Sequence, residues 1–190
     1  IDIEQFGNSF NKIKKYIKVK QPKTVLLDYG GPNIGKPLHV GHLRSLNIGR
    51  SLYRIYGLAG HNVSSDIHMG DWGMPIAQII SYIEYKKIDF ENINIEDLEK
   101  IYPEASKLYS KDDEFKDLAQ ANNKRLNEND SKILKKWKKL KKISVESIKE
   151  TLETLNHKFD IWMGESDVND LIPGMIQKLE SEGKISLDDG

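Results

Sequence analysis

The chain of 190 residues carries 29 basic and 29 acidic side chains, so its formal net charge at neutral pH is zero. That balance argues against a protein that binds nucleic acid through its whole surface, although a local basic segment can still contact a polyanion. The absence of cysteine excludes disulfides and thiolate zinc sites, and no apolar run approaches the length of a membrane span. Because the first residue is Ile1 rather than Met, we expect a piece of a longer chain.

The first expected elements are a helix and a strand. Gln5 to Ile17 has the pattern of a short basic helix. Thr24 to Tyr29 is a compact apolar run of β-forming residues between Pro22 and Gly30, which is typical of a buried strand. Gly30 to Leu38 holds three Gly and two Pro, so we predict a loop there.

A second helix and a second strand follow this loop. Apolar residues recur at helical spacing from His42 onward, and the helix should end near Gly57 or Gly60 with glycine as its C-cap. Asn62 to Ile67 alternates apolar and polar side chains, which predicts a strand. Strand, glycine-rich loop, helix and strand make half of a nucleotide-binding βαβ unit, so we expect the two strands to be parallel.

The remainder of the chain is expected to be mostly helical. Isoleucines from Ile76 to Ile83 mark one helix, and the region from about Ile95 to Phe159 follows helical periodicity throughout. This long region predicts a helical insertion into the nucleotide-binding fold. Residues 160–163 should return to the sheet, and Pro173 to Gly183 should form a further helix.

The residues suited to chemistry gather where the first strand passes into its helix. Amides at a helix N-terminus lack intrahelical partners and the helix dipole adds positive potential, so this position favours anions. His39 and His42 can each add a ring N–H donor, Lys36 adds a positive charge, and Gly41 leaves room for a flat base. The spacing is neither that of a Walker loop nor G-x-G-x-x-G. The loop therefore predicts a nucleoside triphosphate site of another kind.

Three other features of the sequence have competing interpretations. A metal site at His39 and His42 would need further ligands that no sequence pattern supplies, so we predict no protein-bound metal. Asp71 and Trp72, between Gly70 and Gly73, either line the site or form a tight turn with Trp72 packed inside, and both interpretations stay open. The seven lysines of residues 132–142 can meet nucleic acid phosphates, but we favour the solvated face of an amphipathic helix.

The sequence resembles one enzyme family. The string His39-Val40-Gly41-His42 resembles the "HIGH" signature of class I aminoacyl-tRNA synthetases, and the longer run from Pro32 to Ser45 is similar to arginyl-tRNA synthetases in particular. Further similarities to that family occur at Gly70 to Gly73, at Phe159 to Trp162 with Gly164 to Ser166, and at Leu171 to Pro173. The resemblance runs from about Pro22 to Gly190, with its motifs in the family's order.

The resemblance implies an α/β fold, namely the Rossmann-like nucleotide-binding fold of class I synthetases with an α-helical insertion. It divides the chain into four parts. Residues 1–21 form an N-terminal helix and linker, and residues 22–88 form the first part of the catalytic domain with the "HIGH" signature. Residues 89–158 form the helical insertion, and residues 159–190 return to the catalytic domain, which is truncated.

The resemblance also implies activation of L-arginine by ATP and its transfer to the 3′ end of tRNA-Arg. His39, His42 and Lys36 are implied to be catalytic groups on the ATP phosphates, with Gly41 beneath adenine. Asp28 and Asn33 match positions that bind arginine, and a carboxylate suits either its guanidinium or its α-ammonium group. Mg²⁺ is expected with ATP, and the enzyme is expected to be a cytoplasmic monomer without a membrane partner.

Two rival functions remain. Nucleotidyltransferases with a similar signature are small complete domains, and the helical insertion of roughly sixty residues argues against them. A non-catalytic RNA-binding module derived from a synthetase would not need His39, His42 and Lys36 intact. The second family signature, a lysine-rich "KMSKS" loop, is missing from the chain, so we expect this piece alone not to catalyse the full reaction.

Overall fold

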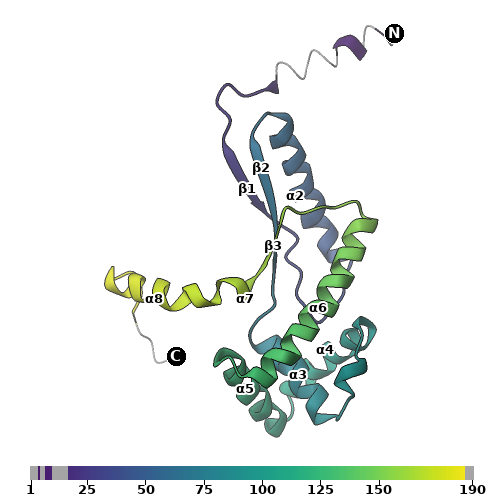
Figure 1. The fold of residues 1–190 in the computed structure, drawn as a ribbon, viewed down its shortest axis with the longest axis vertical. Helices are drawn as coiled ribbons and strands as arrows, with labels where there is room; N and C mark the ends of the chain where they lie inside the picture. Colours follow the sequence, from purple (N-terminus) through teal and green to yellow (C-terminus); the bar gives the residue numbers. More distant parts are fainter. Residues whose placement is uncertain (1–3, 5–6, 10–16, 187–190) are drawn as a thin grey trace.

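The structure is a computed structural model that describes residues 4, 7–9 and 17–186. The helix expected over Gln5 to Ile17 lies mostly outside these residues. Figure 1 shows a small sheet with one helix beside it, a cluster of helices further along the molecule, and a long helix that joins the two regions. A final helical segment extends away from the sheet to one side.

Three parallel strands form the sheet, in the order β1-β2-β3. They are β1 (Thr24–Asp28), β2 (Asn62–Met69) and β3 (Ile161–Gly164). The predicted parallel pairing of the first two strands is confirmed, with Thr24 opposite Asn62 and Asp28 opposite Asp66. The predicted return to the sheet is confirmed too, because β3 pairs with the second half of β2.

Helix α2 (Val40–Leu58) covers one face of the sheet. Its buried Leu46 packs with Ile67 of β2, and Gly49 lies against the ring of Tyr29, which directly follows β1. The helix ends close to the predicted place, but the cap residue is Ala59 rather than a glycine. Gly60 follows at φ +91°, a backbone conformation that glycine adopts without a steric cost.

The helical cluster is built from α3 (Met74–Tyr85), the short 3₁₀ turn η1 (Phe90–Asn92), α4 (Ile95–Tyr109), α5 (Asp113–Asn127) and the start of α6 (Ser131–Thr154). These elements share one hydrophobic core, in which Ile80, Leu98 and Leu126 are fully buried. Helix α3 precedes the predicted insertion in the sequence, yet it packs within this core. The predicted boundary at residue 88 therefore falls inside a shared packing unit.

Helix α6 connects the cluster with the sheet (Figure 1). Its Ile133 and Leu140 belong to the core of the cluster. Its Ile148 and Leu152 pack in a second core with Leu46 of α2 and Ile67 of β2. After β3 the chain continues through α7 (Glu165–Val168), the 3₁₀ turn η2 (Asn169–Leu171) and α8 (Ile172–Ser181), close to the predicted helix. In the described part of the chain, no helix combines the length and apolarity needed to cross a membrane.

The contact between α2 and Tyr29 generates a prediction about stability. A Cβ atom added at Gly49 would lie 2.1 Å from the Tyr29 ring, so Gly49→Ala should lower the free energy of unfolding by about 1–3 kcal/mol through overpacking. Gly57 lies in the same helix with nothing near the added atom, and Gly57→Ala should raise stability by about 0.5–1 kcal/mol. Urea unfolding of both variants tests the packing, and equal effects would contradict it.

Candidate active site at the start of helix α2

The loop between β1 and α2 is fixed first by the loop that follows β2. Ile34 donates its backbone N–H to the Gly70 carbonyl at 3.0 Å, and Gly70 donates to the Pro32 carbonyl at 3.0 Å. The side chain of Asn33 fills the space beside Gly70, where an added Cβ would lie 2.0 Å from Asn33 Oδ1. Only glycine fits at position 70, because Asn33 fills the space that a side chain there would need.

The same loop is fixed a second time by the helical cluster. Gly35 donates its backbone N–H to the buried hydroxyl of Ser144 on α6 at 2.9 Å. Gly35 has φ +88°, and an added Cβ would lie 2.3 Å from the Ile79 side chain, so only glycine fits this position. The next residue, Lys36, places its ammonium group 5.0 Å from the centre of the Tyr102 ring on α4. The loop is thus held between the sheet and the cluster.

His39 and His42 begin α2 as a reciprocal pair. Gly41 donates its backbone N–H to His39 Nδ1 at 3.1 Å, and His39 donates its own backbone N–H to His42 Nδ1 at 3.2 Å. Because a backbone N–H can only donate, an Nδ1 atom that receives one accepts, and the neutral ring then carries its proton on Nε2. His42 Nδ1 also lies 3.3 Å from the His39 carbonyl, to which it donates only when Nδ1 carries a proton. The ring centres lie 4.2 Å apart. With both protons on Nε2, the start of the helix offers two adjacent Nε2–H donors.

The environment of His42 favours its neutral form. Burial lowers the pKa of His42 below its ordinary value of 6.5, and the positive charges of His39 and Lys36 lower it further. The protonated ring can donate from Nδ1 to the His39 carbonyl 3.3 Å away, which acts in the opposite direction and does not reverse the shift. A neutral imidazole with Nε2–H exposed can donate a hydrogen bond to a phosphate oxygen near neutral pH.

The sequence predicted free backbone amides at this helix N-terminus, but two of these amides already have partners. The Gly41 amide is bonded to His39 Nδ1 and the His42 amide to the His39 carbonyl at 2.9 Å, so both are already satisfied. The space beside Gly41 is also occupied, since an added Cβ would lie 2.8 Å from His39 Cε1. The imidazole rings, rather than free backbone amides, are therefore the donors that this helix start has available for an anion.

Asp28 lies at the end of β1, at the carboxyl edge of the sheet. Successive residues of a strand face opposite sides, so Asp28 points away from the face on which Tyr29 contacts α2. No contact links it to His39 or His42 among the residues that the structure describes. Its neighbour in register is Asp66, which is buried, and one carboxylate oxygen of Asp66 has no hydrogen-bond partner.

Asp66 was missed by the sequence analysis. Its other carboxylate oxygen lies 3.6 Å from Nδ1 of His68, which is on the same face of β2. The only sequence signal was the alternation of β2, which places Ser64, Asp66 and His68 together on one face. Asp28 and Asp66 are paired in register where β1 ends, while β2 continues to Met69, and two carboxylates on one face of the sheet give it a negative potential there.

Asp71 makes structural contacts in this structure. Its fully buried carboxylate accepts hydrogen bonds from the Ser166 amide at 2.8 Å and the Ser166 hydroxyl at 2.6 Å, and it lies 2.5 Å from Lys141 Nζ. Its backbone carbonyl accepts a hydrogen bond from the indole of Trp137 at 2.7 Å. Asp71 therefore joins the end of β2 to α6 and α7, and a role in lining the active site stays a prediction.

Trp72 packs against the helical cluster. Its ring meets that of Trp137 edge-on with centres 5.3 Å apart, and its Nε1 donates to Asn127 Oδ1 at 3.0 Å. These contacts are those of a packed side chain, as in one of the two interpretations of the Gly70 to Gly73 segment. These contacts give no indication that Trp72 binds a ligand.

The basic face of α6 differs from the prediction of a solvated face. Its apolar stripe is buried as predicted, but three of the lysines are only partly exposed and pair with acids. Lys136 pairs with Glu84, Lys139 with Glu91 at 3.3 Å, and Lys141 with Asp71. The prediction is wrong for these three lysines, because α3, η1 and the loop after β2 place acids beside them.

The ion pair of Asp71 generates a prediction. Lys141→Met removes the cation beside a buried carboxylate and should lower the free energy of unfolding by about 1–3 kcal/mol, since a buried polar group loses its partner. Lys142→Met changes the next lysine, which is 75% exposed, and should alter stability by less than about 0.5 kcal/mol. Thermal or urea unfolding measures both, and an unaffected Lys141→Met would contradict the role of the pair.

The pKa of His42 generates a second prediction. An NMR titration of its ring should give a midpoint below 6.5, and His39→Gln should raise that midpoint by removing a neighbouring positive charge. As pH falls below 6.5, the unfolded chain takes up the proton first, so His42 lowers the free energy of unfolding in that window and has no such effect above it. A midpoint above 6.5 would contradict the assigned environment.

Comparisons with known proteins show the family of this chain. Residues 6–190 match the family model of the catalytic domain of class I (R) tRNA synthetases. The chain is 37% identical to an arginine–tRNA ligase of Agathobacter rectalis over 187 residues, and 37% identical to one of Alkaliphilus oremlandii over 184 residues. These alignments cover 91% and 90% of the chain but only 31% of each relative, so the chain spans about a third of their length.

Two solved structures are also similar to this chain. The arginyl-tRNA synthetase of Plasmodium falciparum superposes with a TM-score of 0.70 at 30% identity, over 92% of this chain and 30% of that one. The synthetase of Thermus thermophilus, at 22% identity and a TM-score of 0.57, shares the fold. The family match over nearly the whole chain shows that the chain belongs to the class I (R) tRNA synthetase catalytic domain family.

Proposed function

We propose that this chain supplies the ATP-binding part of an arginine–tRNA ligase, which activates L-arginine with ATP and transfers it to the 3′ end of tRNA-Arg. The observation that carries the proposal is the pair of Nε2–H donors that His39 and His42 present at the start of α2. The curated relatives are arginine–tRNA ligases, which supports arginine as the amino acid.

The reaction needs charge stabilisation more than covalent chemistry by the protein. The arginine carboxylate attacks the α-phosphorus of ATP, an oxygen–phosphorus bond forms, and pyrophosphate leaves with the electron pair of the broken bond. Negative charge develops on the phosphate oxygens and on the departing pyrophosphate. Donors fixed in advance at that charge, here His39, His42 and Lys36, bind the transition state more strongly than the ground state.

The fixed orientation of the two rings supports this role. Each imidazole is held by a backbone hydrogen bond to its Nδ1, so little reorganisation is needed when its Nε2–H meets a phosphate oxygen. Gly41 is proposed to lie beneath adenine. The His39 ring borders that position, since an added Cβ at Gly41 would lie 2.8 Å from His39 Cε1, so a base held there would also contact the imidazole.

Asp28 and Asn33 are proposed to bind the arginine. Asp28 ends β1 and is exposed at the carboxyl edge, where ligands of open parallel sheets bind. Asp66 lies beside it with one unpartnered oxygen, which adds a second negative charge toward a guanidinium or ammonium group. The backbone of Asn33 pairs with Gly70 just beyond the end of β2, so Asn33 lies at the same carboxyl edge of the sheet.

The other partners belong to the proposal as well. Mg²⁺ is assigned to the ATP phosphates, which is the usual way a nucleotide site holds it. A group of three or more His, Asp or Glu side chains able to hold a metal does not occur within residues 4, 7–9 and 17–186. In this proposal the full enzyme acts on tRNA-Arg in the cytoplasm and is a monomer.

Kinetics of the full protein test the proposal. In ATP–pyrophosphate exchange with tRNA present, His42→Ala should lower kcat by about 10²–10³-fold, since it removes a donor that acts on transition-state charge. Asp28→Asn should instead raise the KM for arginine and leave the KM for ATP nearly unchanged, because its partner is the amino acid in both states.

His61→Gln is the matched control for the histidine change. His61 lies beyond the other end of α2, where its Nδ1 accepts from the Lys23 amide at 3.0 Å, and this variant should keep full exchange activity. The proposal fails if the wild-type protein exchanges no pyrophosphate with arginine. The residue roles fail if His42→Ala changes only the affinity for ATP or if Asp28→Asn leaves arginine saturation unaltered.

A further inference from the structure

A cleft of about 540 Å³ lies in the helical cluster, away from the start of α2. It is bordered by α3, η1, the end of α5 and the first half of α6. Two acids, Glu84 and Glu91, and an apolar floor that includes Phe90 and Ile133 contribute to its lining. Its remaining lining groups are five cations, namely Arg125, Lys132, Lys135, Lys136 and Lys139.

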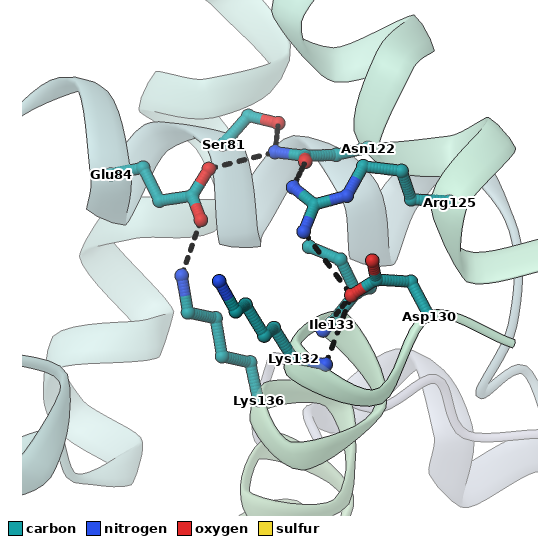
Figure 2. Close-up of polar contacts among 8 residues, drawn as sticks. All are labelled: Ser81, Glu84, Asn122, Arg125, Asp130, Lys132, Ile133 and Lys136. Carbon is teal, nitrogen blue, oxygen red and sulfur yellow. Dashed lines mark hydrogen bonds and ion pairs between the residues drawn. The ribbon is translucent and has the colours of Figure 1, made fainter.

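One wall of the cleft is a fixed hydrogen-bond network, which Figure 2 shows. The Glu84 carboxylate pairs with the Lys136 ammonium group and accepts a hydrogen bond from Asn122 Nδ2 at 2.9 Å. The same amide nitrogen donates to the Ser81 hydroxyl at 2.9 Å. Asn122 and Ser81 are buried, so these contacts hold Lys136 in a defined position at the edge of the cleft.

The network continues to the guanidinium group of Arg125. One of its nitrogens donates to Asn122 Oδ1 at 3.1 Å and the other to Asp130 at 3.1 Å. Asp130 also accepts from the Lys132 and Ile133 amides, where it caps α6 (Figure 2). The ion pair with Asp130 neutralises Arg125 and, together with Asn122, keeps it fixed on the cleft wall.

Two lysines of the lining have no anionic partner. Lys132 and Lys135 make no ion pair within the part of the chain that the structure describes, whereas Glu84 and Glu91 already pair with Lys136 and Lys139. Figure 2 shows the Lys132 side chain directed toward the space beside Lys136. The cleft therefore has an excess of positive charge, which a bound anion would neutralise.

We propose that this cleft binds a compact compound that carries two or more phosphate groups. A phosphate offers several strong acceptor oxygens to converging ammonium and guanidinium donors, which matches the lining better than a single carboxylate does. The lining cations come from α5 and α6 and converge in a concave site, and Lys136 and Lys139 are less than a third exposed. This geometry fits a compact ligand inside the cleft rather than an extended RNA backbone.

Calorimetric titration of the full protein with inorganic tripolyphosphate tests the proposal. We expect saturable binding that the double change Lys132→Gln and Lys135→Gln weakens by about tenfold or more, since two charge-assisted contacts are lost. The matched control changes Lys138→Gln and Lys142→Gln, which lie on the same helix outside the cleft lining. This control should leave the dissociation constant unchanged.

A second variant separates the cleft from the proposed ATP site. The double change His39→Ala and His42→Ala should leave tripolyphosphate binding at the cleft intact, whatever it does to arginine activation. The proposal is overturned if this variant abolishes the binding, if both lysine pairs weaken it equally, or if no saturable binding occurs. It is also overturned if an RNA oligonucleotide binds through Lys132 and Lys135 while tripolyphosphate does not.

Discussion

The buried carboxylate of Asp71 holds together segments that are far apart in the sequence. It receives Lys141 from α6 and both the amide and the hydroxyl of Ser166 from α7. A charge without access to water must be met by such partners, or the fold loses more free energy than the contact supplies. Asp71 follows Gly70, whose backbone pairs with Asn33 in the loop between β1 and α2, so this contact helps to position that loop.

Helix α6 extends this dependence across the molecule. Its Ser144 holds Gly35 of the signature loop, and its Trp137 holds the backbone of Asp71. Near its end, Thr151 and Leu155 line the pocket that also contains His39 and His42, while its first turns line the cationic cleft. One continuous helix therefore borders both candidate sites, and the predicted insertion helps to hold the loop between β1 and α2.

Local patterns predicted most of the elements but not the surroundings of α6. The compact apolar run correctly gave β1 as a strand, but not as the buried strand expected, because Leu26 is 61% exposed. Apolar periodicity correctly gave α2, β2 and the buried stripe of α6, because periodicity reports which face of an element is apolar. It says nothing about which residues lie opposite the margins of that face. Lys136 and Lys139 lie at such margins, and they meet Glu84 and Glu91 only because α3 and η1 pack beside α6.

The sequence alone determined the family resemblance, the strand–loop–helix order and the histidine pair at the start of α2. Those features are local, since His39, Gly41 and His42 bond within one helical turn. Only the tertiary structure decided that Asp66 is buried beside Asp28, that the cations of α5 and α6 share a cleft, and that Gly35 bonds Ser144. The last two residues are 109 positions apart, and contacts at such separation depend on how whole elements pack, which no local pattern encodes.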